Sequence, residues 1–80
     1  MPPKIKYINA DDNYRLLITF DNGIKKIYNF SQKFIDDRYQ LLKNLTFFKS
    51  VQIEPGGYGL FWNEDLDISE NELWQNSEPT

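Results

Sequence analysis

The feature that most constrains the fold is an alternation of apolar and polar residues on both sides of an Asp-Asn-Gly turn at residues 21–23. Across residues 14–20 an aromatic or aliphatic side chain occupies every second position, and even spacing resumes across residues 24–30. A period of two is typical of a β-strand that buries one face. The two segments therefore predict a β-hairpin with an apolar inner face.

Two loop lengths compete in this hairpin, and they differ in which residues lie opposite one another. Opposite residues in an antiparallel pair point to the same side of the sheet, so apolar residues should face apolar residues. A two-residue loop sets apolar residues opposite polar ones. A three-residue loop sets Leu16 opposite Tyr28 and leaves only Ile18 facing a lysine, Lys26. Gly23 suits the left-handed position that this loop requires, so we expect the three-residue loop.

Other segments predict three more short strands. Residues 5–10 contain two isoleucines and a tyrosine and suit a first strand. Residues 51–53 and 58–62 alternate on either side of a Pro-Gly-Gly turn, which predicts a second hairpin.

Helical segments are predicted from residues that are typical helix caps. Ser31 is expected to begin a short helix that buries the apolar pair at residues 34–35, and Asn44 is expected to begin a second one. Ser69, followed three residues later by Glu72, has the spacing of a capping box and predicts a third.

The order of these elements predicts an α+β fold. We expect a small, mainly antiparallel sheet of about five strands with short helices. Residues 1–76 are expected to form a single α+β domain, because 80 residues are too few for two cores, and residues 77–80 to form a frayed C-terminal tail.

The missing residue types narrow the chemistry. The chain has no His and no Cys, so the commonest general base, a thiol nucleophile and the soft metal ligands are absent. The glycine-rich segment 55–59 joins two strands and lacks the pattern and the Lys of a phosphate-binding loop. We therefore expect no catalytic residues, no cofactor, and a protein that is not an enzyme.

Charge and hydropathy indicate the class of partner and the compartment. Nine basic and twelve acidic residues give a net charge of -3, which opposes general binding to nucleic-acid phosphates. The sequence contains no run of apolar residues long enough to cross a membrane and no cysteine for disulfides. We expect a cytoplasmic protein that does not bind membranes.

An acidic loop is the one candidate for binding a cation. Glu64, Asp65 and Asp67 lie close together in the sequence, and oxygen-rich clusters of this kind can hold calcium or magnesium. The ligand spacing of an EF-hand and its closing Glu are missing, which favours a solvated acidic loop. We expect no metal site.

The outer face of the first hairpin carries the most informative anomaly. Arg15, Leu17, Lys25 and Ile27 share this face, and a fully solvated face would not favour two aliphatic residues. Either a neighbouring strand or a helix covers the pair, or the pair binds a partner. The Lys and Arg residues are read either as a solvated face that protects the sheet edges or as a basic stripe.

Aromatic residues gather in the C-terminal half of the chain. Tyr58, Phe61, Trp62 and Trp74 are interpreted mainly as core, although aromatic residues also anchor interfaces. Phe61 points away from its neighbours Leu60 and Trp62 in the alternating pattern. It is therefore the best candidate for an exposed aromatic and joins the predicted partner-binding residues.

A set of short segments, taken in order, also carries a family resemblance. These segments are Tyr14 to Gly23, Ser31, Phe48 to Val51, Gly59 to Trp62, Leu66 to Ser69 and Leu73-Trp74. From Lys4 to Trp74 the chain resembles the bacterial family known as domain of unknown function 2442. It departs from the family at Asp65, where many members have Gly, and at Glu70, where Pro commonly follows Ser. These departures concern loop shape and leave the fold assignment unchanged.

The resemblance implies a regulatory or protein-binding module. The family has no established biochemical role; some members resemble the antitoxin half of a toxin–antitoxin pair, and others are fused to a helix-turn-helix DNA-binding domain. We therefore expect a non-enzymatic protein-interaction module that acts as an antitoxin-like regulator or self-associates. The alternative is a nucleic-acid-binding regulator that uses the Lys/Arg stripe on the sheet.

Overall fold

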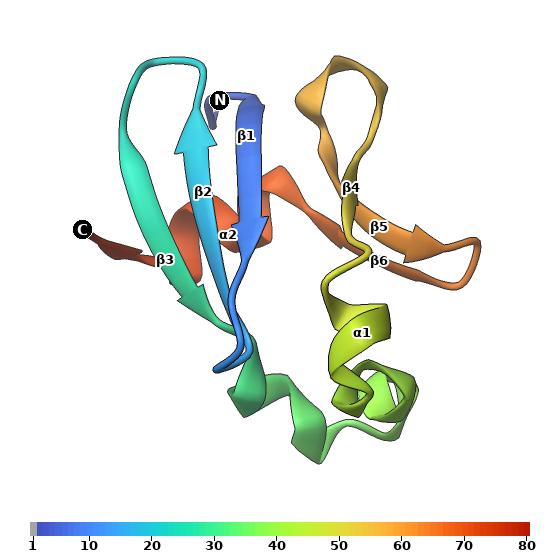
Figure 1. The fold of residues 1–80 in the computed structure, drawn as a ribbon. Coiled ribbons are helices and arrows are strands. Elements are labelled where there is room, and N and C mark those ends of the chain that lie inside the picture. Colours follow the sequence, from blue (N-terminus) through green and yellow to red (C-terminus); the bar gives the residue numbers. More distant parts are fainter. Residues whose placement is uncertain (1) are drawn as a thin grey trace.

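The computed structural model describes residues 2–80, and their strands form two antiparallel sheets (Figure 1). The first sheet, in the order β1-β2-β3-β7, consists of β1 (Ile5–Ala10), β2 (Arg15–Phe20), β3 (Lys25–Asn29) and β7 (Glu78–Pro79). The second, in the order β4-β5-β6, consists of β4 (Gln52–Ile53), β5 (Gly59–Asn63) and β6 (Leu66–Ser69). The helices are the 3-10 helices η1 (Phe30–Ile35), η2 (Asp37–Lys43) and η3 (Pro55–Gly57), and the α-helices α1 (Leu45–Phe48) and α2 (Glu70–Asn76).

The first hairpin has the predicted three-residue loop. Leu16 lies opposite Tyr28 and Ile18 lies opposite Lys26. Gly23 has a φ of 85°, a backbone conformation that side chains with a Cβ rarely adopt. The alternation in the sequence thus determined both the pairing and its register.

The α+β class is confirmed, but the predicted single sheet of about five strands is corrected to one sheet of four strands and one of three. The difference comes from β6 and β7, two strands for which the sequence analysis has no predicted counterpart. β6 pairs with β5, with Ile68 opposite Leu60, and its buried Leu66 and Ile68 alternate with exposed Asp67 and Ser69. That period of two was present in the sequence, in a segment interpreted as an acidic loop.

The C-terminal residues 77–80, predicted to be frayed, are paired in the structure. In β7, Glu78 lies opposite Ile27 of β3 and Pro79 lies opposite Lys26. The Thr80 N–H donates to the Lys25 carbonyl oxygen at 3.3 Å. The free edge of β3 gives these residues hydrogen-bond partners that are distant in sequence, which a local pattern does not show.

The predicted helix caps are correct at two of three positions. Asn44 accepts a hydrogen bond from the Phe47 N–H, and Ser69 accepts one from the Glu72 N–H. The prediction for Ser31 is wrong, because Asn29 is the cap of η1 and accepts bonds from both the N–H and the hydroxyl of Ser31.

The apolar pair at residues 34–35 is also divided by the structure. Phe34 packs against the core, whereas Ile35 is 92% exposed, so its predicted burial is wrong. In a 3-10 helix the side chains repeat every three residues, so two adjacent residues point in different directions.

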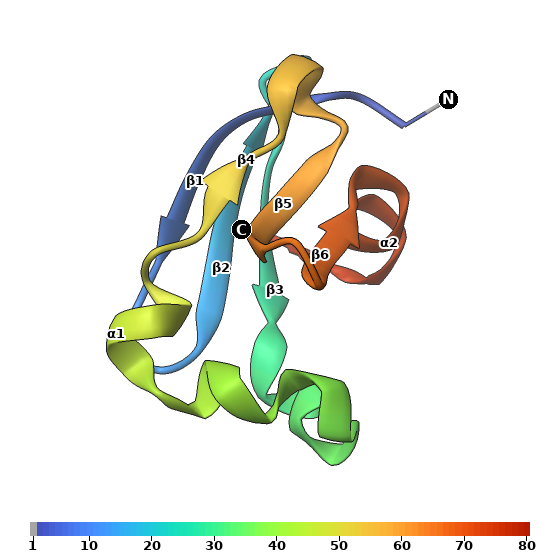
Figure 2. The same ribbon diagram turned by 90° about the vertical axis from the view of Figure 1, so that its right-hand side faces the viewer.

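The core lies between the two sheets and is closed by α2 (Figures 1 and 2). The second sheet contacts the first through β4 and β1, and α2 contacts β3, β5 and β6. Phe30 lies at the centre of an aromatic cluster, where its ring contacts those of Tyr39, Phe48 and Trp62. The indole N–H of Trp62 donates to the Phe48 carbonyl oxygen at 2.8 Å, which satisfies the polar atom of this buried ring.

Candidate interaction surfaces

The structure brings together four of the five residues predicted to bind a partner. Leu17 of β2 lies directly opposite Ile27 of β3, and both are half-buried. Arg15 and Lys25 lie on the same face, at either end of the pair. We call this surface, composed of Arg15, Leu17, Lys25 and Ile27, the open face.

The elements that build the core lie on the other side of this sheet. Figure 2 shows β5, β6 and α2 to one side of β1, β2 and β3. Leu16 and Ile18, which alternate with Leu17, point to that side and are buried. The aliphatic pair was explained either by cover from a neighbouring element or by binding of a partner. Neighbouring strands account for part of its burial, because Ile27 is flanked by Glu78 of β7 and Leu17 by Asn9 of β1.

The aliphatic surface of the open face extends onto β1 and is bordered by hollows. Tyr7 of β1 is 62% exposed and, with Leu17, Thr19 and Lys25, lines a shallow hollow of about 210 Å³. A second hollow, of about 370 Å³, is lined by Ile27 and Arg15 among others. Exposed aromatic and aliphatic groups rimmed by charges are typical of a contact surface.

The basic stripe of the alternative hypothesis is largely occupied by internal contacts. Arg15 forms an ion pair with Asp11 at 2.8 Å. Lys26 reaches away from the open face, and its Nζ donates to the Trp74 carbonyl oxygen at 2.7 Å. Of the two lysines that begin β3, Lys25 alone is exposed. These contacts reduce the positive charge available for phosphate groups.

The fifth predicted residue, Phe61, lies apart from the open face. It is half-buried on β5, in the other sheet, where Gln52 and Asp67 are its neighbours on the adjacent strands. Its ring lines a hollow of about 490 Å³. The five residues predicted to bind a partner therefore lie on two separate surfaces.

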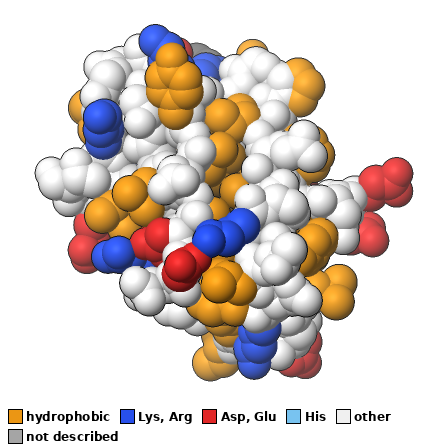
Figure 3. All heavy atoms as spheres, in the orientation of Figure 1, with side chains coloured by type: hydrophobic (Ala, Val, Ile, Leu, Met, Phe, Trp, Pro, Cys, Tyr) orange, Lys and Arg blue, Asp and Glu red, His pale blue; other side chains and the backbone are white. Residues whose placement is uncertain are grey.

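The acidic loop is closed by its own hydrogen bonds. The Asn63 side chain accepts from the N–H groups of Asp65 and Leu66, both at 2.9 Å. Figure 3 shows acidic side chains projecting where the β5-β6 hairpin ends in Figure 1. Within residues 2–80, no three carboxylates are grouped closely enough to hold a metal ion.

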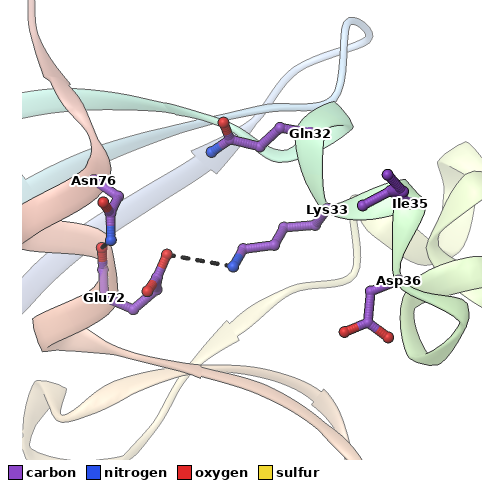
Figure 4. A pocket seen from close by; sticks show the side chains of 6 residues that line it. All are labelled: Gln32, Lys33, Ile35, Asp36, Glu72 and Asn76. Carbon is purple, nitrogen blue, oxygen red and sulfur yellow. Dashed lines mark hydrogen bonds and ion pairs between the residues drawn. The ribbon is translucent and has the colours of Figure 1, made fainter.

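A polar hollow that the sequence analysis missed lies between η1 and α2 (Figure 4). It measures about 460 Å³, and Lys33 reaches across it to Glu72, with 3.4 Å between Nζ and Oε2. The hydroxyl of buried Tyr28 donates to the same carboxylate at 3.1 Å. No sequence signal joins these residues, because they are up to 44 positions apart.

Burial and charge shift the titration of this cluster. Burial raises the pKa of the Tyr28 hydroxyl above its usual 10.0, and the neighbouring Glu72 carboxylate raises it further. Burial by itself would lower the pKa of Lys33, but the charge of the Glu72 carboxylate, and the charge that Tyr28 gains when it ionises, outweigh this effect and raise it. Lys33 is therefore a charged structural tie between η1 and α2 at neutral pH.

Together, the fold and these surfaces define a small α+β domain with one open sheet face and a separate aromatic hollow. The chain belongs to the family described as "Protein of unknown function (DUF2442)", whose model matches residues 5–79. No curated protein and no solved structure matches it. None of the helices formed by residues 2–80 has the length and apolar character needed to cross a membrane.

Proposed function

We propose that this protein is a non-enzymatic interaction module of the cytoplasm that binds a protein partner through its open face. The observation that carries the proposal is the Leu17-Ile27 pair, which lies on the side of the sheet opposite the core. Cross-strand aliphatic pairs stabilise a sheet modestly even when they are exposed, but a solvated face does not favour them. Burial against a partner would remove the pair and Tyr7 from water.

The non-enzymatic part of the proposal is supported by the side chains that line the hollows. The hollow between η1 and α2 offers the amine of Lys33 and the carboxylate of Glu72, which are already paired with each other. Its other carboxylate, Asp36, is paired with Arg38. Acid–base catalysis needs a group whose pKa lies near neutral pH, and the shift at Lys33 is away from neutrality. The chain also has no His and no Cys.

A more specific version of this proposal is that the protein regulates its partner in the manner of an antitoxin. The net charge of -3 suits a basic partner, because opposite charges accelerate association and favour the complex. The partner is then a small basic protein, and its gene is expected beside that of this chain. Self-association through the open face is the other form, with two copies placing their aliphatic pairs together.

The test compares two double variants made by the same kind of substitution. Leu17→Glu with Ile27→Glu places charge on the open face, whereas Ile35→Glu with Leu41→Glu places it on side chains that are 92% and 64% exposed elsewhere. Each tagged protein is crosslinked and purified from its native cell, and its mass in solution is measured by light scattering.

We expect the wild type and the control to retain a partner or form a dimer, and the open-face variant to lose it. Circular dichroism should show that all three proteins are folded. A wild type that is monomeric and retains no protein, under conditions that preserve known complexes, would refute the proposal. Equal retention by the open-face variant would also refute it.

A further inference from the structure

The hollow around Phe61 is separate from the open face and differs from it in charge. Phe61 lies on the outer side of the β4-β5-β6 sheet, because its neighbours Leu60 and Trp62 point into the core. Pro55 adds an apolar group to the lining of this hollow, and Asn63 adds a polar one. The ring is half-buried, so part of its surface is accessible from the hollow.

Three carboxylates stand around this ring. Glu54, Glu64 and Asp67 line the hollow, and no Lys or Arg lines it with them. Asp67 lies directly opposite Phe61 on the neighbouring strand. Glu54 extends over Gly59, where an added Cβ would meet its Oε2 at 2.7 Å.

These carboxylates form no ion pair with the rest of the described chain. Across residues 2–80 the ion pairs use other acidic residues, and none includes Glu54, Glu64 or Asp67. Lys33 and Arg38 share an adjoining hollow with Glu54 and Asp67, and the charge of Arg38 interacts with Asp67. Both cations have other partners, because Lys33 is paired with Glu72 at 3.4 Å and Arg38 with Asp36 at 2.9 Å. The hollow therefore concentrates negative charge beside an aromatic ring, and this charge repels anions and attracts cations.

An aromatic ring flanked by carboxylates suits one kind of side chain. The face of the ring carries partial negative charge and attracts an ammonium or guanidinium group placed above it. Carboxylates at the rim add charge-assisted hydrogen bonds, and the long alkyl stem of Lys or Arg packs on the apolar wall. A metal ion would need its ligands grouped closely, which is not the case within residues 2–80.

We propose that the Phe61 hollow binds a Lys- or Arg-bearing segment of a protein partner, with the cation over the ring and between Glu54, Glu64 and Asp67. This inference rests on the proposed function, since it adds a second contact surface to the same interaction module. It also limits the partner to one with an exposed basic segment. A second copy of this chain fits less well, because five of its nine Lys and Arg residues are already in ion pairs.

The test measures the binding of a short fluorescein-labelled peptide in which arginine alternates with leucine, by fluorescence anisotropy. The double variant Glu64→Gln with Asp67→Asn removes two charges from the hollow. The matched control, Asp37→Asn with Glu78→Gln, removes two charges from exposed carboxylates elsewhere. Phe61→Leu keeps an apolar side chain but removes the aromatic face.

We expect saturable binding to the wild type that weakens about tenfold or more in the Glu64/Asp67 variant. Binding should weaken by a few-fold in Phe61→Leu and stay within about twofold of wild type in the control. A peptide with glutamine in place of arginine should not bind. The open-face variant Leu17→Glu/Ile27→Glu should bind the peptide like the wild type, which separates this inference from the proposed function.

Three results would overturn the inference. Equal weakening in the Glu64/Asp67 variant and the control would show general charge attraction without a site. Weaker peptide binding in the open-face variant alone would show that the peptide binds to the other sheet. A dimer seen by light scattering, dissociated by the Glu64/Asp67 substitutions, would make a second copy the occupant of the hollow.

Discussion

Lys26 of β3 lies over the indole ring of Trp74, with its Nζ 3.8 Å from the ring centroid, and donates a 2.7 Å hydrogen bond to the Trp74 carbonyl oxygen. Trp74 is in the last turn of α2, where carbonyl groups lack partners within the helix and attract positive charge. Lys26, which lies opposite Ile18, can therefore occupy the core-facing side of the sheet, because its amine reaches the C-terminal end of α2. It joins the hairpin to α2.

Replacing Lys26 should weaken this junction. Lys26→Met keeps the alkyl stem but removes the charge and the donor, so we expect a loss of about 1 to 2 kcal/mol in the free energy of unfolding. The control is Lys25→Met on the exposed side of the same strand, with an expected change within about 0.5 kcal/mol. Urea unfolding followed by tryptophan fluorescence measures both. Equal effects in the two variants would contradict the role of Lys26.

The close contact between η3 and β1 should make Gly57 less replaceable than Gly23. A Cβ at Gly57 would lie 2.5 Å from the Ile5 carbonyl oxygen, in addition to the strain of a φ of 78°. At Gly23 the φ is 85° but the space is open. We expect Gly57→Ala to cost about 3 kcal/mol or more and Gly23→Ala about 1 kcal/mol. Thermal unfolding compares them, and a Gly23 variant as unstable as the Gly57 variant would show that the contact is unimportant.

Adjacent leucines on β2 should differ sharply in their contribution to stability. Leu16 is fully buried, so Leu16→Ala should cost about 3 kcal/mol. Leu17 is half-buried on the open face, so Leu17→Ala should cost about 1 kcal/mol or less. Both values come from denaturant unfolding of the isolated chain. If Leu17→Ala were as destabilising as Leu16→Ala, the open face would be part of the core.

Alkaline pH should destabilise the protein through Tyr28. Its pKa is raised in the folded state, so the folded state holds the proton more strongly, and this contribution is lost as pH rises above 10.0. Lys33, whose pKa is also raised, acts in the same direction from 10.5 upward. Tyr28→Phe should reduce the decline in stability above about pH 10, although it costs about 1 kcal/mol at neutral pH through the lost bond to Glu72.

The control for this pH dependence is Tyr7→Phe, because Tyr7 is 62% exposed. Its stability should fall with alkaline pH as steeply as that of the wild type. A decline unchanged in Tyr28→Phe would show that other groups control stability at high pH.

The first hairpin and two helix caps were predictable because their causes are local. The alternation from Leu16 to Tyr28 permits one register with apolar residues face to face, and Gly23 fits the loop that this register needs. Asn44 and Ser69 satisfy N–H groups only three residues away. Each of these choices depends on residues that are near one another in the chain.

The candidate surfaces were predictable only in part. Arg15, Leu17, Lys25 and Ile27 were brought together correctly, because the hairpin register alone places them on one face. The alternating pattern correctly predicted that Phe61 points to the other side of its strand from Leu60 and Trp62. It did not show that this strand belongs to a different sheet from Leu17 and Ile27. Its acidic neighbours are Glu54, which directly follows β4, and Asp67, which lies on β6, so their grouping depends on strand pairing.

The sequence by itself determined the α+β class, the family and the hairpin around Gly23, because spacing along the chain dictates which side chains share a face. The tertiary structure alone decided the division into two sheets, the pairing of residues 78–79 with β3, and the contact between Lys26 and Trp74. The last two features join residues roughly 50 positions apart, and their stability comes from burial and hydrogen bonds that exist only once the chain is folded.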